Sequence, residues 1–151
     1  MIKLILLVIL TIYSYAEEPT ELHKVAQEEN RNLEAIHECV DKITPELVRR
    51  NSKATAYEIC TNSLEGGVDP MLVVSIGIVE SSLRGNCFGN EYNIFCIRRH
   101  DNFYDSYNDS VRDVVALIRD SGQTDPRLVG KWYCPPTADE WANDVIYLME
   151  K

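Results

Sequence analysis

The feature that most constrains the fold is an apolar run at residues 71–79, which ends at the carboxylate of Glu80. A helix that is apolar in nearly every direction has to be covered by other elements on most sides. Asp69-Pro70 before the run provides a capping side chain and a proline for the first turn, and Gly85 after it provides a terminator. The run therefore predicts a central, buried helix over residues 70–83.

The segments on either side also have helical patterns. Apolar residues recur at three- and four-residue steps over residues 22–43, and residues 44–46 (Thr-Pro-Glu) predict the start of a second helix that ends at the glycines 66–67. Residues 110–113 and 137–140 are capping boxes and predict two further helices. Residues 84–109 and 131–136 lack periodicity and are expected to be loops. The fold class predicted is all-α.

The first sixteen residues are typical of a secretory signal peptide. Lys3 precedes an apolar stretch at residues 4–10, and Ser14-Tyr15-Ala16 resembles a cleavage site. The stretch is short for a membrane span, and an uncleaved anchor is the alternative. We therefore expect an exported protein, periplasmic or secreted. We expect the chain to be organised as a signal peptide at residues 1–16, an N-terminal helical region at residues 17–66 and a core at residues 67–151. The helical region and the core are expected to form a single domain.

Charge and cysteine content narrow the possible partners. The chain has 24 acidic and 15 basic residues, a net charge of −9, which argues against nucleic-acid binding. In an exported chain disulfides are plausible, and no His or Cys pair has zinc-ligand spacing, so neither a metal nor a cofactor is expected. The five cysteines are Cys39, Cys60, Cys87, Cys96 and Cys134.

The pairing of these cysteines stays open at this point. Cys87 and Cys96 would close a short loop. For Cys39 and Cys60, a helical hairpin turning near residue 44 would leave a mismatch of roughly eleven residues at about 1.5 Å each, too far for the Cα separation of about 7 Å that a disulfide tolerates.

A lone carboxylate at the end of a buried helix has a chemical use. Partial burial and the negative end of the helix dipole both disfavour ionisation, so Glu80 is expected to hold its proton and act as a general acid. A solvated glutamate at a helix end is the alternative, because many helices end in this way.

Four motifs then occur in one order along the chain. They are Val79-Glu80-Ser81-Ser82, residues 90–98, residues 103–111 and the aromatic residues 132–145. Together they resemble the bacterial peptidoglycan lytic transglycosylase and glucosaminidase families, which share the lysozyme-like fold. The resemblance covers residues 69–149. It implies a lysozyme-like domain with little or no β lobe, because only residues 99–103 stand where glucosaminidases insert a β-hairpin.

The resemblance assigns the catalytic acid to Glu80 and places Ser81 or Ser82 beside it. Tyr92 and Asn93 would line the adjacent sugar subsite. The candidates to stack on sugars or bind their hydroxyls are Tyr104, Tyr107 and Tyr133. The alternative for each tyrosine is packing in the core or at the rim of the domain. The alternative for Asn93 is a turn residue that hydrogen-bonds its own backbone.

The missing hairpin also removes the second acid of a hydrolase. The nearby acids Glu91, Asp101, Asp105 and Asp109 are expected to be loop or capping residues. Hydrolysis usually needs two carboxylates, whereas lytic transglycosylases, by analogy, use one glutamate and the substrate's own 6-hydroxyl. We therefore expect a lytic transglycosylase that cleaves the β-1,4 bond between N-acetylmuramic acid and N-acetylglucosamine in peptidoglycan glycan strands.

Two other functions remain open. An inactive lysozyme-like module would bind the wall, or act as a scaffold in a secretion, conjugation or phage assembly through residues 17–66. A helical inhibitor or assembly factor would be unrelated to wall sugars and would not bind glycan.

Overall fold

The structure is a computed structural model and describes residues 20–97 and 104–151. The predicted signal peptide lies outside the described residues. The chain divides into two units, one ending at Ala35 and the other comprising Ile36–Lys151. The described part of the first unit is the N-terminal half of a helix, and the second unit contains every other element.

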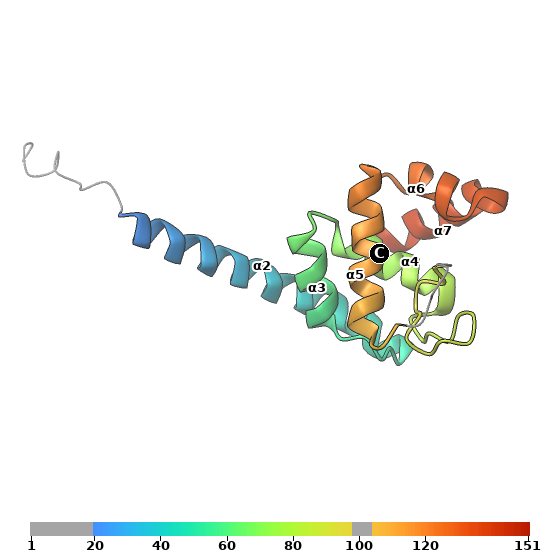
Figure 1. The fold of residues 1–151 in the computed structure, drawn as a ribbon, viewed down its shortest axis with the longest axis horizontal. Helices are drawn as coiled ribbons and strands as arrows, with labels where there is room; N and C mark the ends of the chain where they lie inside the picture. Colours follow the sequence, from blue (N-terminus) through green and yellow to red (C-terminus); the bar gives the residue numbers. More distant parts are fainter. Residues whose placement is uncertain (1–19, 98–103) are drawn as a thin grey trace, which may run out of the picture. The chain divides into compact units, whose positions relative to one another are not determined.

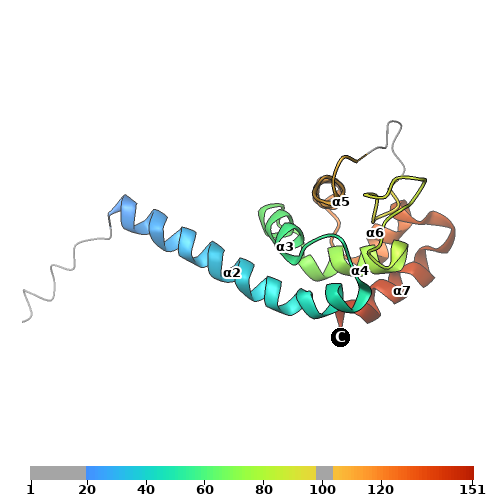
Figure 2. The same cartoon turned by 90° about the horizontal axis from the view of Figure 1, so that it is seen from below.

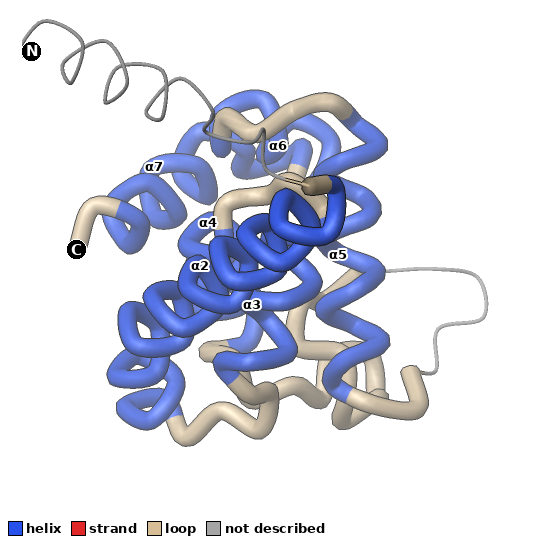
Figure 3. The backbone as a smooth tube through the Cα atoms, turned by 90° about the vertical axis from the view of Figure 1, so that its left-hand side faces the viewer, coloured by secondary structure: helices blue, strands red, loops and turns tan. Residues whose placement is uncertain are grey.

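The described residues form helices joined by loops (Figures 1 and 3), and they include no strand, only an isolated bridge between Cys87 and Asn90. The prediction of an all-α fold is confirmed. The elements are α2 (Glu21–Arg50), α3 (Ala56–Glu65), α4 (Pro70–Ser81), α5 (Tyr107–Ser121), α6 (Pro126–Tyr133), a 3-10 turn η1 (Pro135–Thr137) and α7 (Ala138–Met149).

Helix α4 is the predicted central helix. Seven consecutive residues from Leu72 to Ile78 are buried, and α4 contacts α3, α5 and α7 (Figure 2). The Asp69 side chain accepts a hydrogen bond from the backbone N–H of Met71 at 2.8 Å, and Pro70 occupies the first turn, as predicted. The burial of α4 fixes where its C-terminal residue, and with it Glu80, can lie.

The end of α4 comes two residues earlier than predicted. Ser82 adopts the left-handed conformation at φ 56° and ends the helix before Gly85 is reached. Leu83 follows with φ 61° and is fully buried, because the chain turns back beneath α4 beside Gly77. Gly85 has a different role: a Cβ there would collide with the carbonyl oxygen of Glu91.

The predicted helix start at residues 44–46 is wrong, because α2 continues through Pro45. Ile43 and Leu47 lie one helical turn apart and are 1% and 5% exposed. Burying both on one side of a single helix offsets the hydrogen bond that proline cannot make. Glu46 bonds both Arg49 and Arg50, and this network further stabilises the turn that contains the proline.

The true break in this region lies at residues 51–55. Asn51 is left-handed at φ 53°, and Thr55 caps α3 by accepting from the backbone N–H of Glu58. The Glu58 side chain accepts from the backbone N–H of Thr55 in return, so the two residues form a capping box. The Thr-x-x-Glu pattern at residues 55–58 was the sequence signal for this helix start.

Helices α5 and α6 also differ from prediction. Helix α5 begins at Tyr107 with Ser106 as its cap, so Ser110 lies buried inside the helix and is not its cap. Helix α6 was not predicted, and its last three residues, 131–133, belong to the segment that was expected to form a loop. Asp125-Pro126 opens it as Asp69-Pro70 opens α4. Helix α7 begins where predicted, although Thr137 makes no side-chain capping bond.

Two disulfides are present, with Cα–Cα distances of 5.9 Å for Cys39–Cys60 and 5.0 Å for Cys87–Cys96. The distance argument against Cys39–Cys60 is wrong, because it placed the turn near residue 44 and the helix continues to Arg50. Cys134 is a free thiol. Two disulfides are typical of proteins from an oxidising, exported environment.

No helix in the described ranges has the length and apolar character needed to cross a membrane.

Candidate functional site

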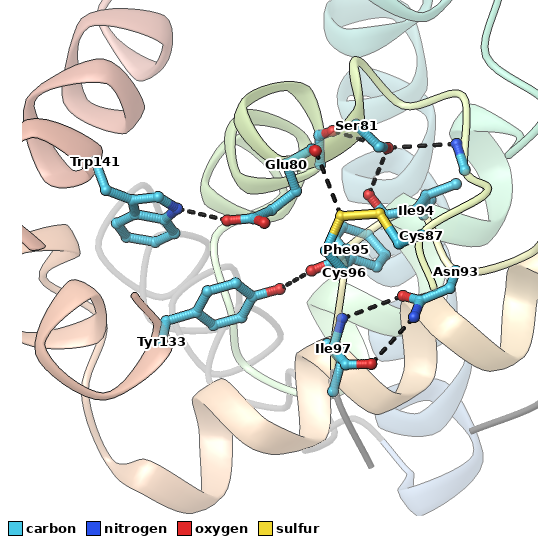
Figure 4. The surroundings of a disulfide bond; sticks show 12 residues. Glu80, Ser81, Cys87, Asn93, Ile94, Phe95, Cys96, Ile97, Tyr133 and Trp141 are labelled. Carbon is cyan, nitrogen blue, oxygen red and sulfur yellow. Dashed lines mark hydrogen bonds between the residues drawn. A yellow bond between two sulfur atoms is a disulfide. The ribbon is translucent and has the colours of Figure 1, made fainter. Parts of the chain in front are cut away.

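Glu80 lies in the last turn of α4, with its side chain partly buried (Figure 4). Its Oε1 accepts a hydrogen bond from the indole Nε1 of Trp141 at 2.7 Å. Burial raises the pKa of the Glu80 carboxyl, and the indole bond offsets part of that rise because it favours the ionised form. Glu80 is therefore a carboxyl that keeps its proton to a higher pH than an exposed glutamate does.

The indole is held by the packing of α6 against α7. Trp141 is 4% exposed, and its ring stacks on that of Tyr133 with centroids 5.3 Å apart and an angle of 26° between the planes. Gly130 of α6 is so close that an added Cβ would lie 3.1 Å from Trp141 Cε3. The donor that faces Glu80 is therefore fixed in position by two helices.

The loop at residues 82–97 folds back over the end of α4 and is tied to it by side chains. Ser81 Oγ donates to the carbonyl of Ile94 at 2.7 Å and accepts from the backbone N–H of Gly85 at 3.3 Å. The Tyr133 hydroxyl donates to the carbonyl of Phe95 (Figure 4). These bonds join α4, the loop and α6 around Glu80.

The Cys87–Cys96 disulfide packs directly against the catalytic candidate. The Cys96 sulfur lies 3.4 Å from the backbone carbonyl oxygen of Glu80. A disulfide sulfur carries no proton, so this is a packing contact and not a hydrogen bond. The covalent staple therefore supports the backbone at Glu80.

Left-handed backbone is concentrated in this loop. Besides Ser82 and Leu83, three further residues other than glycine have positive φ: Asn86 at 69°, Phe88 at 56° and Cys96 at 50°. Each such residue costs of order 1–3 kcal/mol, and residues of this kind gather at functional sites. Ser82 itself is partly buried, and its backbone N–H bonds the carbonyl of Ile78.

Asn93 is placed inside the loop. It is 0% exposed, its Nδ2 donates to the carbonyl of Ile97 at 3.0 Å, and its Oδ1 accepts from the Ile97 N–H at 3.2 Å. The amide therefore braces the loop in this structure, and its effect on any ligand is through the shape of the loop.

Tyr92 and Tyr107 pack against each other. Their rings meet edge to face with centroids 5.1 Å apart. The Glu91 carboxylate raises the pKa of Tyr92, and burial followed by the Glu91 charge raises the pKa of Tyr107. Both hydroxyls are therefore neutral donors over the physiological range.

Tyr104 belongs to a second polar pair. Its hydroxyl donates to Asp113 Oδ2 at 2.6 Å, and together with Tyr92 it lines an open hollow of about 440 Å³. Burial raises the pKa of Tyr133 far above its usual value, and the charges of Glu80, Tyr104 and Asp113 raise it further. Tyr133 is therefore close enough to Glu80 and to the Tyr104–Asp113 pair to respond to the charges of all three residues.

Two residues of this arrangement were not among the predicted site residues. Trp141 was expected only as part of the aromatic motif at residues 132–145, and Asp113 only as part of the capping box at residues 110–113. The signal for Trp141 was its indole N–H, which needs an acceptor when the ring is buried. Of the predicted residues, the structure brings Glu80, Ser81 and Tyr133 together around the loop, and Tyr92 packs on Tyr107. Tyr104 shares a hollow with Tyr92 and also acts on Tyr133.

Within residues 20–97 and 104–151, no group of three or more His, Cys, Asp or Glu side chains is arranged to hold a metal ion. Comparisons of the chain with protein-family models, with curated proteins and with solved structures find no match.

Proposed function

We propose that this protein is an exported enzyme that cleaves the β-1,4 bond between N-acetylmuramic acid and N-acetylglucosamine, as a lytic transglycosylase with Glu80 as its acid and base. One observation carries the proposal. Glu80 is a partly buried carboxyl with a raised pKa, at the end of the central helix, with a rigid N–H donor on one oxygen. A carboxyl that keeps its proton to a higher pH, in a partly buried position, is what a glycosidase acid needs.

In the first step the Glu80 proton moves to the glycosidic oxygen as the bond from that oxygen to C1 of the muramoyl sugar breaks. Positive charge develops on the sugar ring, and Glu80 becomes a carboxylate. The Trp141 N–H stabilises that carboxylate, because a hydrogen bond to an ionised group is stronger than one to a neutral group.

In the second step the 6-hydroxyl of the same muramoyl sugar attacks C1. Its proton passes to the Glu80 carboxylate, which restores the acid, and the sugar is left with a 1,6-anhydro ring. The nucleophile is part of the substrate and is already close to C1, so little further activation is needed. The two steps need one carboxyl group and no added water.

Asp113 supports hydrolysis as a second route. Its carboxylate binds Tyr104 and influences Tyr133, which in turn lies near Glu80. A retaining or inverting hydrolase needs a second carboxylate across the scissile bond from the acid, and Asp113 would have to fill that role, with a water molecule in place of the 6-hydroxyl.

The positions of Asn93 and Tyr92 favour the non-enzymatic alternative in its scaffold or assembly form over its wall-binding form. Both residues were expected to contact sugar, yet Asn93 is fully buried with its amide committed to Ile97, and Tyr92 packs on Tyr107.

Digestion of purified sacculi, followed by mass analysis of the soluble products, tests the proposal. Muramoyl products that carry 1,6-anhydro ends are expected. Products with reducing ends would show that the enzyme is a hydrolase and would contradict the transglycosylase mechanism. Protein that pellets with sacculi and releases no fragments would overturn the enzyme in favour of a binding module, and protein that neither cleaves nor pellets would overturn a wall function.

A further inference from the structure

The indole of Trp141 constrains which oxygen of Glu80 can carry the proton. Within the described residues the Glu80 side chain makes one hydrogen bond, in which Trp141 Nε1 donates to Oε1 at 2.7 Å. An indole N–H can only donate. In a protonated carboxyl group one oxygen carries the hydrogen and the other, the carbonyl oxygen, is the better acceptor. When Glu80 is protonated, the short N–H···Oε1 bond therefore makes Oε1 the carbonyl oxygen.

We infer that Trp141 is a positioning residue that keeps the acidic hydrogen of Glu80 on Oε2, the oxygen that the indole leaves free. The placement of the hydrogen is a property of the resting protein. Only the identity of its acceptor, a glycosidic oxygen, rests on the proposed function.

The indole can impose this choice because its own orientation does not depend on Glu80. The ring stacks on Tyr133, and the backbone of α6 at Gly130 approaches the other part of the ring closely. A Cβ at position 130 would also lie 2.9 Å from the carbonyl oxygen of Ala138. Rotating the indole away from Oε1 would therefore require α6 to move from α7.

Among the described residues, the titratable groups around this pair are few. Tyr133 approaches from α6 with its pKa raised, so it stays neutral, and its hydroxyl hydrogen is donated to Phe95. Cys87 and Cys96 are joined and do not titrate. Tyr104 and Asp113 on the α5 side act on Tyr133. Glu80 is therefore the titrating group that the Trp141 N–H should report.

The first test uses the unmodified protein. The chain has two tryptophans, so its ¹⁵N-labelled form gives two indole N–H signals in an NMR spectrum, and Trp132→Phe assigns them. As Glu80 ionises, the Trp141 signal should shift downfield, because its acceptor becomes charged. The same signal should stay constant through this pH range in Glu80→Gln. A Trp141 signal that does not titrate in the wild type, or that titrates equally in Glu80→Gln, would overturn the inference.

The second test removes the donor. Trp141→Phe keeps an aromatic ring but loses the N–H, so the pKa of Glu80 should rise by about one pH unit. Carboxyl ¹³C NMR on protein with a wild-type circular dichroism spectrum measures the change, and Trp132→Phe is the matched control. An unchanged value in folded Trp141→Phe would contradict the positioning role.

The same variants separate this inference from the proposed function. On sacculi, Trp141→Phe should lower kcat and move the basic limb of the pH profile upward, with KM little changed. If the indole signal titrates as expected but the wild type cleaves no glycan, the inference stands and the proposed function fails.

Discussion

Glu80 is a partly buried carboxyl with a hydrogen-bond donor on one oxygen, and it is the residue proposed to act as the acid. Its carboxyl is shielded enough for burial to raise the pKa, and it lies in the last turn of α4. Because burial disfavours the ionised carboxylate, the placement of Glu80 should also affect how the stability of the protein varies with pH.

The folded-state pKa of Glu80 lies above its ordinary value of 4.5, so the native state holds the proton more tightly than the unfolded chain does. The stability that this group contributes is fully present below pH 4.5 and is lost as the pH rises through the folded-state value. Glu80→Gln is uncharged at every pH. Its Tm should match that of the wild type at about pH 4 and exceed it at neutral pH. A Tm difference that does not vary with pH would show that Glu80 is not shielded.

Two glycines of the loop at residues 82–97 have similar backbone conformations and different surroundings, so their substitutions can be compared. Gly85 and Gly89 have φ of +77° and +81°, but a Cβ at Gly85 would overlap the Glu91 carbonyl, whereas a Cβ at Gly89 would meet nothing within 4 Å. Gly89→Ala should lose about 1–2 kcal/mol of unfolding free energy through its backbone conformation alone. Gly85→Ala should lose clearly more by chemical denaturation. Equal losses would mean that the loop does not pass so closely over residue 85.

At the scale of elements, local signals determined what could be predicted. Asp69-Pro70 and the apolar run give α4 its start and its central position, and both are seen. The prediction was wrong at Pro45, because the burial of Ile43 and Leu47 overrides a local breaker. It missed α6 although Asp125-Pro126 repeats the signal that opens α4.

The candidate site was predictable only in part. Glu80 followed from its position after the apolar run. Its bond to Trp141 joins residues 61 positions apart in the sequence, and no local pattern encodes such a contact. The commitment of Asn93 to Ile97 likewise depends on how the loop closes under its disulfide.

The two disulfides should differ in function more than in stability. Replacing Cys87 and Cys96 with alanine releases the loop that contacts Glu80, whereas replacing Cys39 and Cys60 leaves that loop closed. In the chain-entropy model each removal costs about 3 kcal/mol of unfolding free energy. Below the melting temperature of both variants, only the Cys87/Cys96 variant should lose most of its activity on sacculi. Equal activity losses in the two variants would contradict a specific role of the Cys87–Cys96 disulfide in activity.

At the scale of the whole molecule, the candidate site belongs entirely to the unit Ile36–Lys151. The N-terminal unit carries the apolar side chains of Leu22, Val25 and Leu33, which are exposed. Docking of a partner assembly through residues 17–66 stays a prediction. Substitution of these three exposed side chains would test it.

A chain that begins at Ile36 should therefore fold and keep the chemistry of the site. It retains both disulfides and every contact of Glu80 described above. Its Tm and its activity on sacculi should lie close to those of the chain beginning at Glu17. A truncated chain that lacks a cooperative unfolding transition would show that residues 17–35 are required for the compact unit.

The most direct test of the account is the turnover of purified sacculi by Glu80→Gln. This substitution keeps the size of the side chain and removes its proton. The loss of a general acid predicts a fall in the rate of about 10²- to 10⁴-fold, with a wild-type circular dichroism spectrum. Glu65→Gln, a change at an exposed carboxylate on α3, should clear sacculi at the wild-type rate. A Glu80→Gln protein that clears sacculi as fast as the wild type would contradict the central claim that this carboxyl protonates the glycosidic bond.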